Sequence, residues 1–437
     1  MSADSESELK QLFTESLASD DLVTVGTTVD TGFEWQAIDE CKEKLDKNIR
    51  IFKARGKIYF NIQRGQFSKV QDMRSIDNIF IVGDVHKFNF IGSDKEADLE
   101  LFKHAVHGSM KLDKCLNIWK DVTGFMGKMY PTAEEYDRAH KHHKVCEKVE
   151  TPVVHRGRKR GLDPSDTRND DILKYRVTCE RTGKHSFESS DVARVVGGEL
   201  QDKYLWLVDL SAYHLEIICK LVHNEMVTHL RVTYLSKHRR NIMYFGPTTL
   251  RATICYNLLR LANPRPGDII IDPMCGGGSI PIEAVLAFPQ TYVISGDNHP
   301  KAVARTKSNI EATVADCKID LMQWSASGLP LMDSCVDIII TDMPFGKRSG
   351  RMTDNRVLYK QFLVEFGRIV KCSTGRIVLL TYDRRSISMA LQTAGDLFRV
   401  TKTLGVNIGG LQAAVYVLKR TSTTYEQYTP KKPQSRS

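Results

Sequence analysis

Short runs of mostly apolar residues recur through the second half of the chain, each followed by a stretch in which apolar residues return with helical spacing. The runs DIIID, TYVISGD, IDLMQW, VDIIITD and GRIVLLTYD are typical of strands buried on both faces of a parallel sheet. The helical stretches open near residues 279, 300, 356 and 385. Strands that alternate with helices predict a doubly wound α/β sheet.

The end of this region has a different pattern. Two β runs in TKTLGVNIGGLQAAVYVLKRT, on either side of Gly409-Gly410, predict an antiparallel hairpin. With the five runs before it, the hairpin brings the expected sheet to seven strands. We therefore predict one α/β domain over residues 237–420.

The first half mixes strands and helices differently. DLVTVGTTVDTGFEWQAIDECKEKL predicts a strand and a helix, and IRIFKARGKIYFNI predicts a hairpin around Arg55-Gly56-Lys57. RSIDNIFIVGDV adds a helix end and a strand, which together indicate a small α+β, ferredoxin-like unit over 21–110. KYRVTCERTG, a helix around 189–200 and LWLVDLSAYHLEIICKLVHNEMVTHLRVTYL predict a second α+β unit, over 111–236.

Three stretches lack regular spacing. Residues 1–20 are acidic and polar, so we expect a mobile tail and no secretion signal or mitochondrial presequence. Residues 131–172 are charged, poor in aliphatic side chains and rich in turn formers, which predicts a flexible insertion in the second unit. Residues 421–437 are expected to form a C-terminal tail.

The cysteines and the hydropathy indicate a reduced, water-soluble protein. Ten cysteines occur singly, without a Cys-x-x-Cys pair, which argues against a zinc ribbon or a disulfide framework. His140-Lys141-His142-His143 with Cys146 has irregular spacing, so we expect no metal site. No apolar stretch is long enough to cross a bilayer. We expect the cytosol, with the nucleus left open.

The charge balance suits a polyanionic partner without proving one. The 62 Lys and Arg residues exceed the 53 Asp and Glu residues, which gives a net charge of +9, an excess also common in proteins that bind no nucleic acid. Basic pairs at Arg239-Arg240 and Lys347-Arg348 can neutralise RNA phosphates. Taken alone, each pair is better explained as a solvated surface than as an RNA contact.

The strongest local signal for chemistry is IIIDPMCGGGSIPIEA, residues 269–284. A buried strand is expected to end at Asp272, and a helix follows a loop of three glycines. Glycines let the backbone approach a ligand closely, and a helix N-terminus offers free N–H groups, which together predict a Rossmann-type nucleotide site. The alternative is a tight turn that binds nothing.

Two further strand ends favour the nucleotide site. The second strand ends at Asp297, where an acid accepts hydrogen bonds from ribose hydroxyls in this fold. The fourth strand ends in Asp342-Met343-Pro344-Phe345. The Asp342 carboxylate and the Pro344 carbonyl can both accept hydrogen bonds from an exocyclic amine, and Phe345 offers a ring on which a base can stack. The alternative is a strand stopped by proline, with a capping Asp and a buried Phe.

These segments resemble a known family. DPMCGGGSIPIEA, GDN and TDMPFGKR are similar to the amine-directed methyltransferases that join this domain to a THUMP RNA-binding module and make N2-methylguanosine in tRNA. HRRNIMYFGPTTLR, VNIGGLQAAVYVLKR, DLVTVGTTVDTGFE, ARGKIYF and KYRVTCERTGKHSFESSDVARVVGG resemble other parts of the same family. The resemblance covers nearly the whole chain outside the two tails and 131–172.

The resemblance implies a cofactor, partners and site residues. The cofactor would be S-adenosylmethionine, and Asp342, Pro344 and Phe345 would hold the guanine amine. THUMP modules hold the 3′ end of tRNA, which implies a target in the acceptor region, and the family also implies a small zinc-binding activator subunit. The residues implied for the cofactor are Thr249, Pro273, Cys275, Gly276, Gly278, Asp297, Asn298 and Ser325.

The resemblance leaves specific questions open. Ser325 stands where the family usually has an acid that contacts the adenine amine. Direct methyl transfer needs no covalent enzyme intermediate, so Cys275 is interpreted as a cofactor contact and not a nucleophile. One alternative is a methyltransferase for another RNA or protein amine. Another is a non-catalytic RNA-binding scaffold, which Ser325 would favour.

Overall fold

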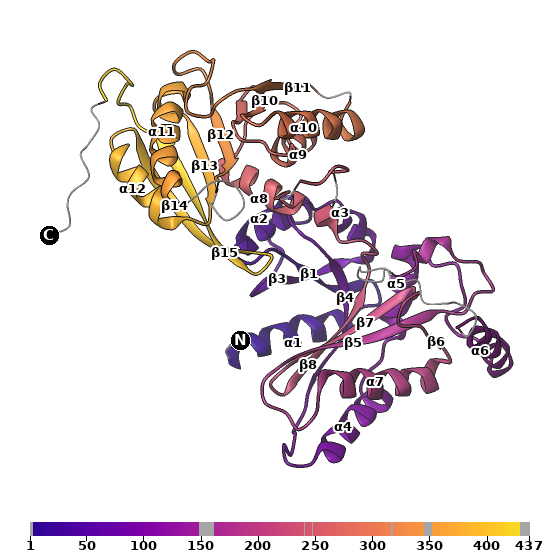
Figure 1. Cartoon of the computed structure of the whole chain (residues 1–437). Coiled ribbons are helices and arrows are strands. Elements are labelled where there is room, and N and C mark those ends of the chain that lie inside the picture. The colour runs from indigo at the N-terminus through magenta and orange to yellow at the C-terminus, as the bar shows by residue number, and fades with distance from the viewer. Residues whose placement is uncertain are drawn as a thin grey trace. The chain divides into compact units, whose positions relative to one another are not determined.

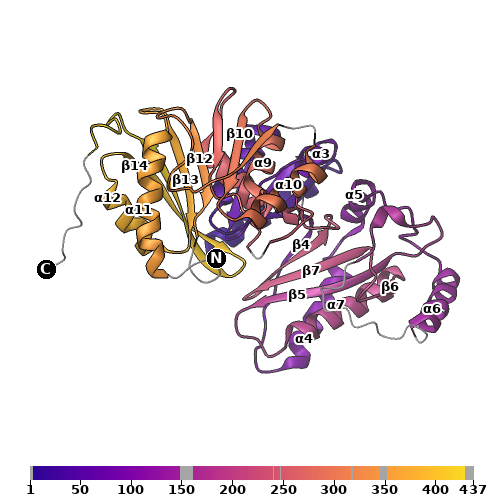
Figure 2. The same cartoon turned by 45° about the horizontal axis from the view of Figure 1, so that its top comes forward.

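The computed structural model describes residues 3–147, 161–239, 241–246, 248–315, 318–344 and 352–428. The chain divides into two compact units (Figures 1 and 2). Unit 1 runs from the N-terminus to Thr28 and includes Cys41–Met73 and Asn78–Ser236. Unit 2 contains Val29–Glu40, Arg74–Asp77 and the chain from Lys237 onward. The helix α2 (Glu34–Lys44) runs across the boundary at Glu40.

Unit 1 is built on one sheet of eight strands in the order β2-β3-β1-β4-β8-β7-β5-β6. The pairs are antiparallel except for β5, which lies parallel to β6 and β7. The predicted hairpin is present, and Gly56 forms its turn with φ 70°. The strands are β1 (Leu22–Thr28), β2 (Ile51–Ala54), β3 (Lys57–Gln63), β4 (Ile79–Lys87), β5 (Lys174–Thr182), β6 (Leu207–Val208), β7 (Leu215–Val222) and β8 (Glu225–Arg231).

The two halves of this sheet join where β4 pairs with β8, with Phe80 opposite Arg231. The ferredoxin-like pattern expected over 21–110 is therefore part of a larger sheet that residues 111–236 complete. The remaining elements of the unit are α1 (Ala3–Leu17), η1 (Arg64–Gln66), α3 (Phe67–Gln71), α4 (Lys95–Gly108), α5 (Asp113–Thr123), α6 (Ala133–Glu147), η2 (Pro164–Asp166) and α7 (Ser189–Tyr204).

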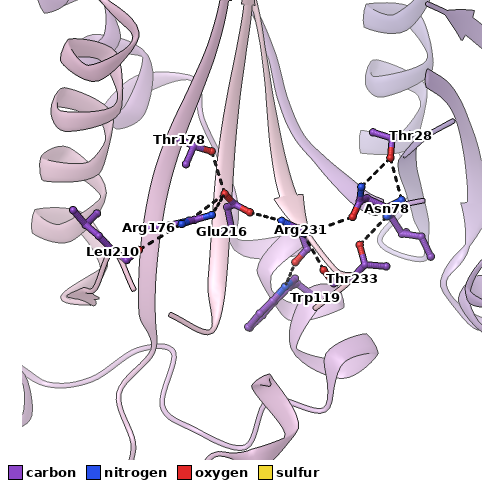
Figure 3. Close-up of polar contacts among 10 residues, drawn as sticks. Thr28, Asn78, Trp119, Arg176, Thr178, Leu210, Glu216, Arg231 and Thr233 are labelled. Atoms are coloured by element: carbon purple, nitrogen blue, oxygen red, sulfur yellow. Dashed lines mark hydrogen bonds and ion pairs between the residues drawn. The ribbon is translucent and has the colours of Figure 1, made fainter. Parts of the chain in front are cut away.

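A polar network crosses this junction (Figure 3). Glu216 on β7 accepts hydrogen bonds from Arg176 on β5 (Nη2 to Oε1, 2.7 Å) and from Arg231 on β8 (Nη1 to Oε2, 2.8 Å). Arg231 also donates to Asn78 Oδ1 at 3.1 Å, and the Asn78 amide donates to Thr28 Oγ1 at 3.1 Å. Because the Glu216 side chain is only 5% exposed, the two guanidinium groups compensate its buried charge.

Two stretches expected to lack structure contain helices. The tail expected over 1–20 instead forms α1, because Leu9, Leu12 and Phe13 share one helical face and are buried against the sheet. Within 131–172, residues Ala133–Glu147 form α6, and residues 148–160 lie outside the described residues. The apolar spacing of α1 is sparse in a polar sequence, so its burial was not evident from the pattern.

Unit 2 contains the predicted seven-stranded sheet, in the order β11-β10-β9-β12-β13-β15-β14. The five strands from β9 to β13 are parallel, and the terminal hairpin β14–β15 pairs antiparallel with β13. The strands are β9 (Ile269–Asp272), β10 (Tyr292–Asp297), β11 (Ile319–Gln323), β12 (Ile338–Asp342), β13 (Arg376–Thr381), β14 (Phe398–Ile408) and β15 (Leu411–Arg420).

Helices cover both faces of this sheet (Figures 1 and 2). The helices α11 and α12 pack together over fully buried Ile339, Ile377 and Leu379, whereas α8 and α9 pack together on the other side. None of the helices in the described part of the chain is long and apolar enough to span a membrane. The elements are η3 (Lys237–Arg239), α8 (Ala252–Ala262), α9 (Ser279–Ala287), α10 (Pro300–Thr313), α11 (Met352–Ile369) and α12 (Arg384–Thr393).

The strand order fixes where a ligand can bind. The central strand β9 lies between β10 and β12 and is parallel to both. The connections therefore run outward in opposite directions from β9, and the loops after β9, β10 and β12 leave a crevice between them. Open α/β sheets bind ligands in this crevice at the carboxyl ends of their strands.

Candidate active site

A cavity of about 310 Å³ lies at the carboxyl ends of β9, β10 and β12, which end at Asp272, Asp297 and Asp342. Its size falls in the range of small-molecule sites. Among the predicted cofactor residues, Gly278 alone is outside its lining, whereas Gly277 is part of it. The described lining residues are Gly246, 248–250, 272–277, Ser279, Ile280, Asp297, Asn298, Arg305, 325–327, 342–344, Leu358 and Phe362.

The glycine loop turns the chain from β9 into α9. Gly276 has φ 59° and Gly278 has φ 84°, a left-handed conformation that favours glycine. An added Cβ at Gly276 would project into open space, so the loop leaves its backbone accessible from the cavity. An added Cβ at Gly278 would lie 2.9 Å from Thr306 Cγ2. Gly276 thus leaves room for a ligand, and Gly278 permits the turn and the close approach of α10.

Asp297 is held against this loop by backbone hydrogen bonds. Its Oδ2 accepts from Gly276 N at 3.1 Å, and its Oδ1 accepts from His299 N at 2.9 Å. A carboxylate has about four acceptor positions, so both oxygens can still accept hydrogen bonds from a ligand. Asn298 lines the cavity beside it.

The segment that follows the third strand, β11, contributes Ser325, Ala326 and Ser327 to the lining. The hydroxyls of Ser325 and Ser327 lie 2.8 Å apart, so one donates to the other. Trp324 Nε1 donates to Pro273 O at 3.1 Å, which ties this segment to the loop after β9. Ser325, which stands where the family usually has an acid, is therefore paired with a second hydroxyl, that of Ser327.

Two other predicted residues are partly engaged by the protein. The Thr249 hydroxyl accepts from Gly246 N at 2.7 Å, so it stabilises a turn at the edge of the cavity. Cys275 is 6% exposed, and its Sγ lies 3.5 Å from Thr306 Oγ1. Burial raises the pKa of the Cys275 thiol, which keeps it protonated and unsuited to nucleophilic attack.

The cavity is acidic at its base. Burial raises the pKa of Asp272 to about 8 and the pKa of Asp342 to about 7. Asp272 Oδ1 accepts from Met274 N at 3.2 Å. The Oδ1 atom of Asp342 is buried and has no hydrogen-bond partner among the described residues. These carboxylates, together with Asp297, favour a ligand that brings positive charge and hydrogen-bond donors.

The Pro344 carbonyl is fixed by α11 and β13. Tyr359 Oη donates to Pro344 O at 2.5 Å and lies 2.9 Å from Thr381 Oγ1. Because a carbonyl only accepts, the Tyr359 proton points to Pro344, and Thr381 must donate to Tyr359. Asp383 N donates in turn to Thr381 Oγ1 at 3.0 Å. The chain of donors leaves one lone pair of the Pro344 carbonyl free for a ligand.

Several predicted residues are not described. Phe345, Lys347, Arg348 and Arg240 lie outside the described residues, as does the side chain of Arg239 at the end of η3. In contrast, the lining includes Arg305, Leu358 and Phe362, which the sequence did not single out. Leu358 and Phe362 stand four residues apart on one face of α11, a spacing that also describes an ordinary core helix.

Comparisons with known proteins identify a methyltransferase family and named relatives. Residues 239–414 match the family described as the RMKL-like methyltransferase domain. The chain is 38% identical to the tRNA (guanine(6)-N(2))-methyltransferase THUMP3 of Bos taurus, over 92% of this chain and 89% of that protein. The Mus musculus protein of the same name is 37% identical, over 92% of this chain and 90% of its own length.

A solved structure has the same fold. TrmN from Thermus thermophilus superimposes with a TM-score of 0.68 at 20% identity, over 91% of this chain and 99% of that chain. The similarity therefore extends through both units and is not restricted to the catalytic sheet. The chain belongs to the family of THUMP3 tRNA (guanine(6)-N(2))-methyltransferases.

Proposed function

We propose that this chain transfers a methyl group from S-adenosylmethionine to N2 of a guanosine in the acceptor region of tRNA, at position 6 as in the names of its relatives. One observation carries the proposal. The cavity that the glycine loop opens also contains Asp342, with an unpartnered buried oxygen, and the Pro344 carbonyl. A nucleoside cofactor and an amine that donates hydrogen bonds fit into one crevice.

The cofactor fits the residues present. Gly276 and Gly277 offer accessible backbone, Asp297 offers acceptors for ribose hydroxyls, and Ser325 with Ser327 offers acceptors for the adenine amine. S-adenosylmethionine, when bound, supplies the methyl group on a positively charged sulfur. The carboxylates that line the cavity compensate that positive charge.

The guanine amine is recognised by two acceptors. Its two N–H groups would donate to the Asp342 carboxylate and the Pro344 carbonyl, which turns the nitrogen lone pair out of the base plane and toward the methyl group. An exocyclic amine is a poor nucleophile, so this orientation is the main contribution. With a pKa of about 7, Asp342 is partly ionised at neutral pH and can accept the proton that the amine loses.

The hydrogen-bond chain behind Pro344 supports this geometry. Tyr359 holds the carbonyl in place from the protein side, so the acceptor direction facing the cavity is preorganised. Tyr359 acts through Pro344 and does not line the cavity itself, which makes it a positioning residue.

The experiment that tests the function measures tritium transfer from labelled S-adenosylmethionine to total tRNA, followed by digestion to nucleosides. We expect label in N2-methylguanosine with the wild type and a loss of at least about a hundredfold with Asp342→Ala. Asp342→Asn keeps the side-chain shape and separates packing from acid–base chemistry. Label in a different nucleoside would favour another amine, and no label together with no cofactor binding would favour an RNA-binding scaffold.

We also propose that a small zinc-binding activator subunit binds the edge strand β11. Among the described strands, β11 has β10 as its one neighbour, and its half-buried Ile319, Leu321 and Met322 leave an apolar edge that a partner strand can cover. Co-purification of the two chains would support this, and Leu321→Asp should abolish it, whereas Leu411→Asp at the opposite end of the sheet should not. Persistence of binding in Leu321→Asp would contradict this position.

Residues 111–236, expected to form the THUMP module, are proposed to bind tRNA at its 3′ end. The basic residues Arg239, Arg240, Lys347 and Arg348 are proposed to contact RNA phosphates. The cytoplasm suits the cysteines of the described residues, none of which forms a disulfide with another described cysteine. Neutralising each of these residues should reduce the slope of log affinity for tRNA against log salt concentration by about one.

A further inference from the structure

Three large apolar side chains stand exposed next to the cavity. Met243, Tyr244 and Phe245 are 68%, 54% and 61% exposed, and the next residue, Gly246, lines the cavity. Single exposed apolar side chains are common on protein surfaces, but three in sequence beside a binding site mark a surface that a partner covers.

The backbone under these side chains is fixed by Asn309 of α10. The fully buried Asn309 amide accepts from Met243 N at 3.1 Å and from Tyr244 N at 2.8 Å. It also donates to Tyr244 O at 3.0 Å and to Gly277 O at 2.8 Å. Asn309 therefore ties the exposed segment to the glycine loop. Exposed rings on a fixed backbone lose little conformational entropy when a ligand stacks on them.

Positive charge lies beside the rings. The Arg305 guanidinium contacts Gly246, since an added Cβ there would lie 2.6 Å from Nη1, and Arg305 lines the cavity. Arg305 forms no ion pair with a described residue. Lys301, one turn earlier on α10, is exposed. Aromatic faces beside cations that form no ion pair with a described residue are the combination that proteins use for single-stranded nucleic acid, because the bases stack and the phosphates supply the negative charge.

The reaction itself requires such a surface. The N2 amine of a paired guanine is hydrogen bonded inside a helix, so the base must leave its stack to reach the Asp342 carboxylate. Its neighbours then expose their faces at the mouth of the cavity. We propose that Tyr244 and Phe245 form a stacking platform for the nucleotides that flank the target guanosine, with Arg305 binding a phosphate between them. This inference rests on the proposed function and extends it to the RNA next to the target.

Ultraviolet crosslinking of the full chain to total tRNA tests the platform without methyl transfer. Trypsin releases residues 241–251 as one peptide, because Arg240 and Arg251 flank it. We expect a nucleotide adduct on Tyr244 or Phe245 in this peptide. Adducts on other peptides only, or none on 241–251 in a preparation that binds tRNA, would overturn the proposal.

Substitutions supply the second measurement. Tyr244→Ala and Phe245→Ala should each lower kcat/KM for tRNA roughly five- to hundredfold, with the dissociation constant for S-adenosylmethionine unchanged within twofold. Tyr244→Phe and Phe245→Tyr keep the aromatic face and should retain activity. Leu411→Ala, an exposed apolar side chain at the tip of the β14–β15 hairpin, is the matched control.

The outcomes separate the two proposals. An adduct on 241–251, with neither cofactor binding nor methyl transfer by the wild type even when the activator is supplied, would leave the platform standing and reject the proposed function. Methyl transfer that survives both alanine substitutions at full kcat/KM would reject the platform alone. Loss of activator binding in the alanine variants, with unchanged crosslinking and unchanged kcat/KM once the activator is supplied in excess, would assign the surface to a protein partner and also reject the platform.

Discussion

Three carboxylates, Asp272, Asp297 and Asp342, end adjacent parallel strands around one cavity. Without a cationic ligand this arrangement is unfavourable, because burial raises the pKa of Asp272 to about 8 and of Asp342 to about 7. Because folding raises the pKa of both carboxyl groups, the stability that they contribute is fully present below their ordinary pKa of 3.8. That stability is lost as the pH rises from there through 7 and 8. A positively charged ligand reverses this cost.

The first prediction concerns the pH dependence of cofactor binding. A cationic sulfur favours the ionised carboxylates, so the affinity for S-adenosylmethionine should increase from pH 6 to pH 8, with proton release near pH 7. S-adenosylhomocysteine lacks the charge on sulfur, so its affinity should change less. Calorimetry with both ligands in buffers of different ionisation enthalpy measures affinity and proton release together. Asp342→Asn should make the pH dependence of the two affinities more alike. If the wild type binds both ligands with the same pH dependence, the carboxylates do not respond to the charge on sulfur.

The second prediction concerns Tyr359. Burial raises the pKa of its phenol, so the hydroxyl remains a neutral donor to Pro344 throughout the working pH range. Tyr359→Phe removes that donor, and we expect kcat to fall about three- to tenfold while KM for tRNA stays within twofold. Thr381→Val should have a smaller effect, and the double variant should add little, because both act through one chain of hydrogen bonds. Tyr256→Phe, a buried tyrosine of α8, is the control for packing.

Whole elements were predictable where local sequence decides their burial. The mostly apolar strands, the loop of three glycines and the turn at Gly409-Gly410 predicted the seven-stranded sheet and its terminal hairpin because each signal is local. The contribution of helix faces was not predictable, since Arg305 and Phe362 reach the cavity only through the packing of α10 and α11. Asn309 lies inside a helix, and its hydrogen-bond partners, among them Met243 and Gly277, are far away in sequence. Its role was therefore not predictable from local sequence.

The third prediction belongs to α1, the helix that replaced an expected tail. Leu12 is 1% exposed and packs with Phe52 and Tyr59 of unit 1. Leu12→Ala should destabilise the packing of α1 by about 2–5 kcal/mol, whereas Lys10→Ala on the exposed face should be nearly neutral. Hydrogen exchange of the first 20 residues measures this locally. If these residues exchange equally fast in the wild type and in both variants, α1 is not stably packed and the expected mobile tail is correct.

At the scale of the molecule, unit 2 is not a continuous piece of chain. It includes Val29–Glu40 and Arg74–Asp77 as well as everything from Lys237 onward. Glu283 of α9 is fully buried and is neutralised by Arg74, with distances of 2.7 and 2.9 Å between the two pairs of atoms. The backbone of Arg74 is held in turn by the buried Glu40 carboxylate. A fragment that begins at residue 237 would lack Arg74, the ion-pair partner of Glu283.

The fourth prediction is that Arg74→Ala destabilises unit 2 by about 3–5 kcal/mol, because removing one member of a buried ion pair leaves an uncompensated charge. The cofactor site should weaken as well, since Ser279 and Ile280 at the start of α9 line the cavity one turn before Glu283. Hydrogen exchange in the peptides of unit 2, measured on the full chain in increasing denaturant, reports the loss of stability. The dissociation constant for S-adenosylmethionine reports the effect on the cofactor site.

The double variant Arg74→Met with Glu283→Leu distinguishes the pair from a general dependence on this segment. It removes both charges and keeps comparable volume, so most of the lost stability should return. If the double variant is as unstable as Arg74→Ala, the contribution of Arg74–Asp77 to unit 2 lies in its backbone contacts, such as the hydrogen bond from Asn257 to Ser75 O, and not in charge compensation. In either case the unit that contains the seven-stranded sheet depends on residues that lie about 200 positions earlier in the chain.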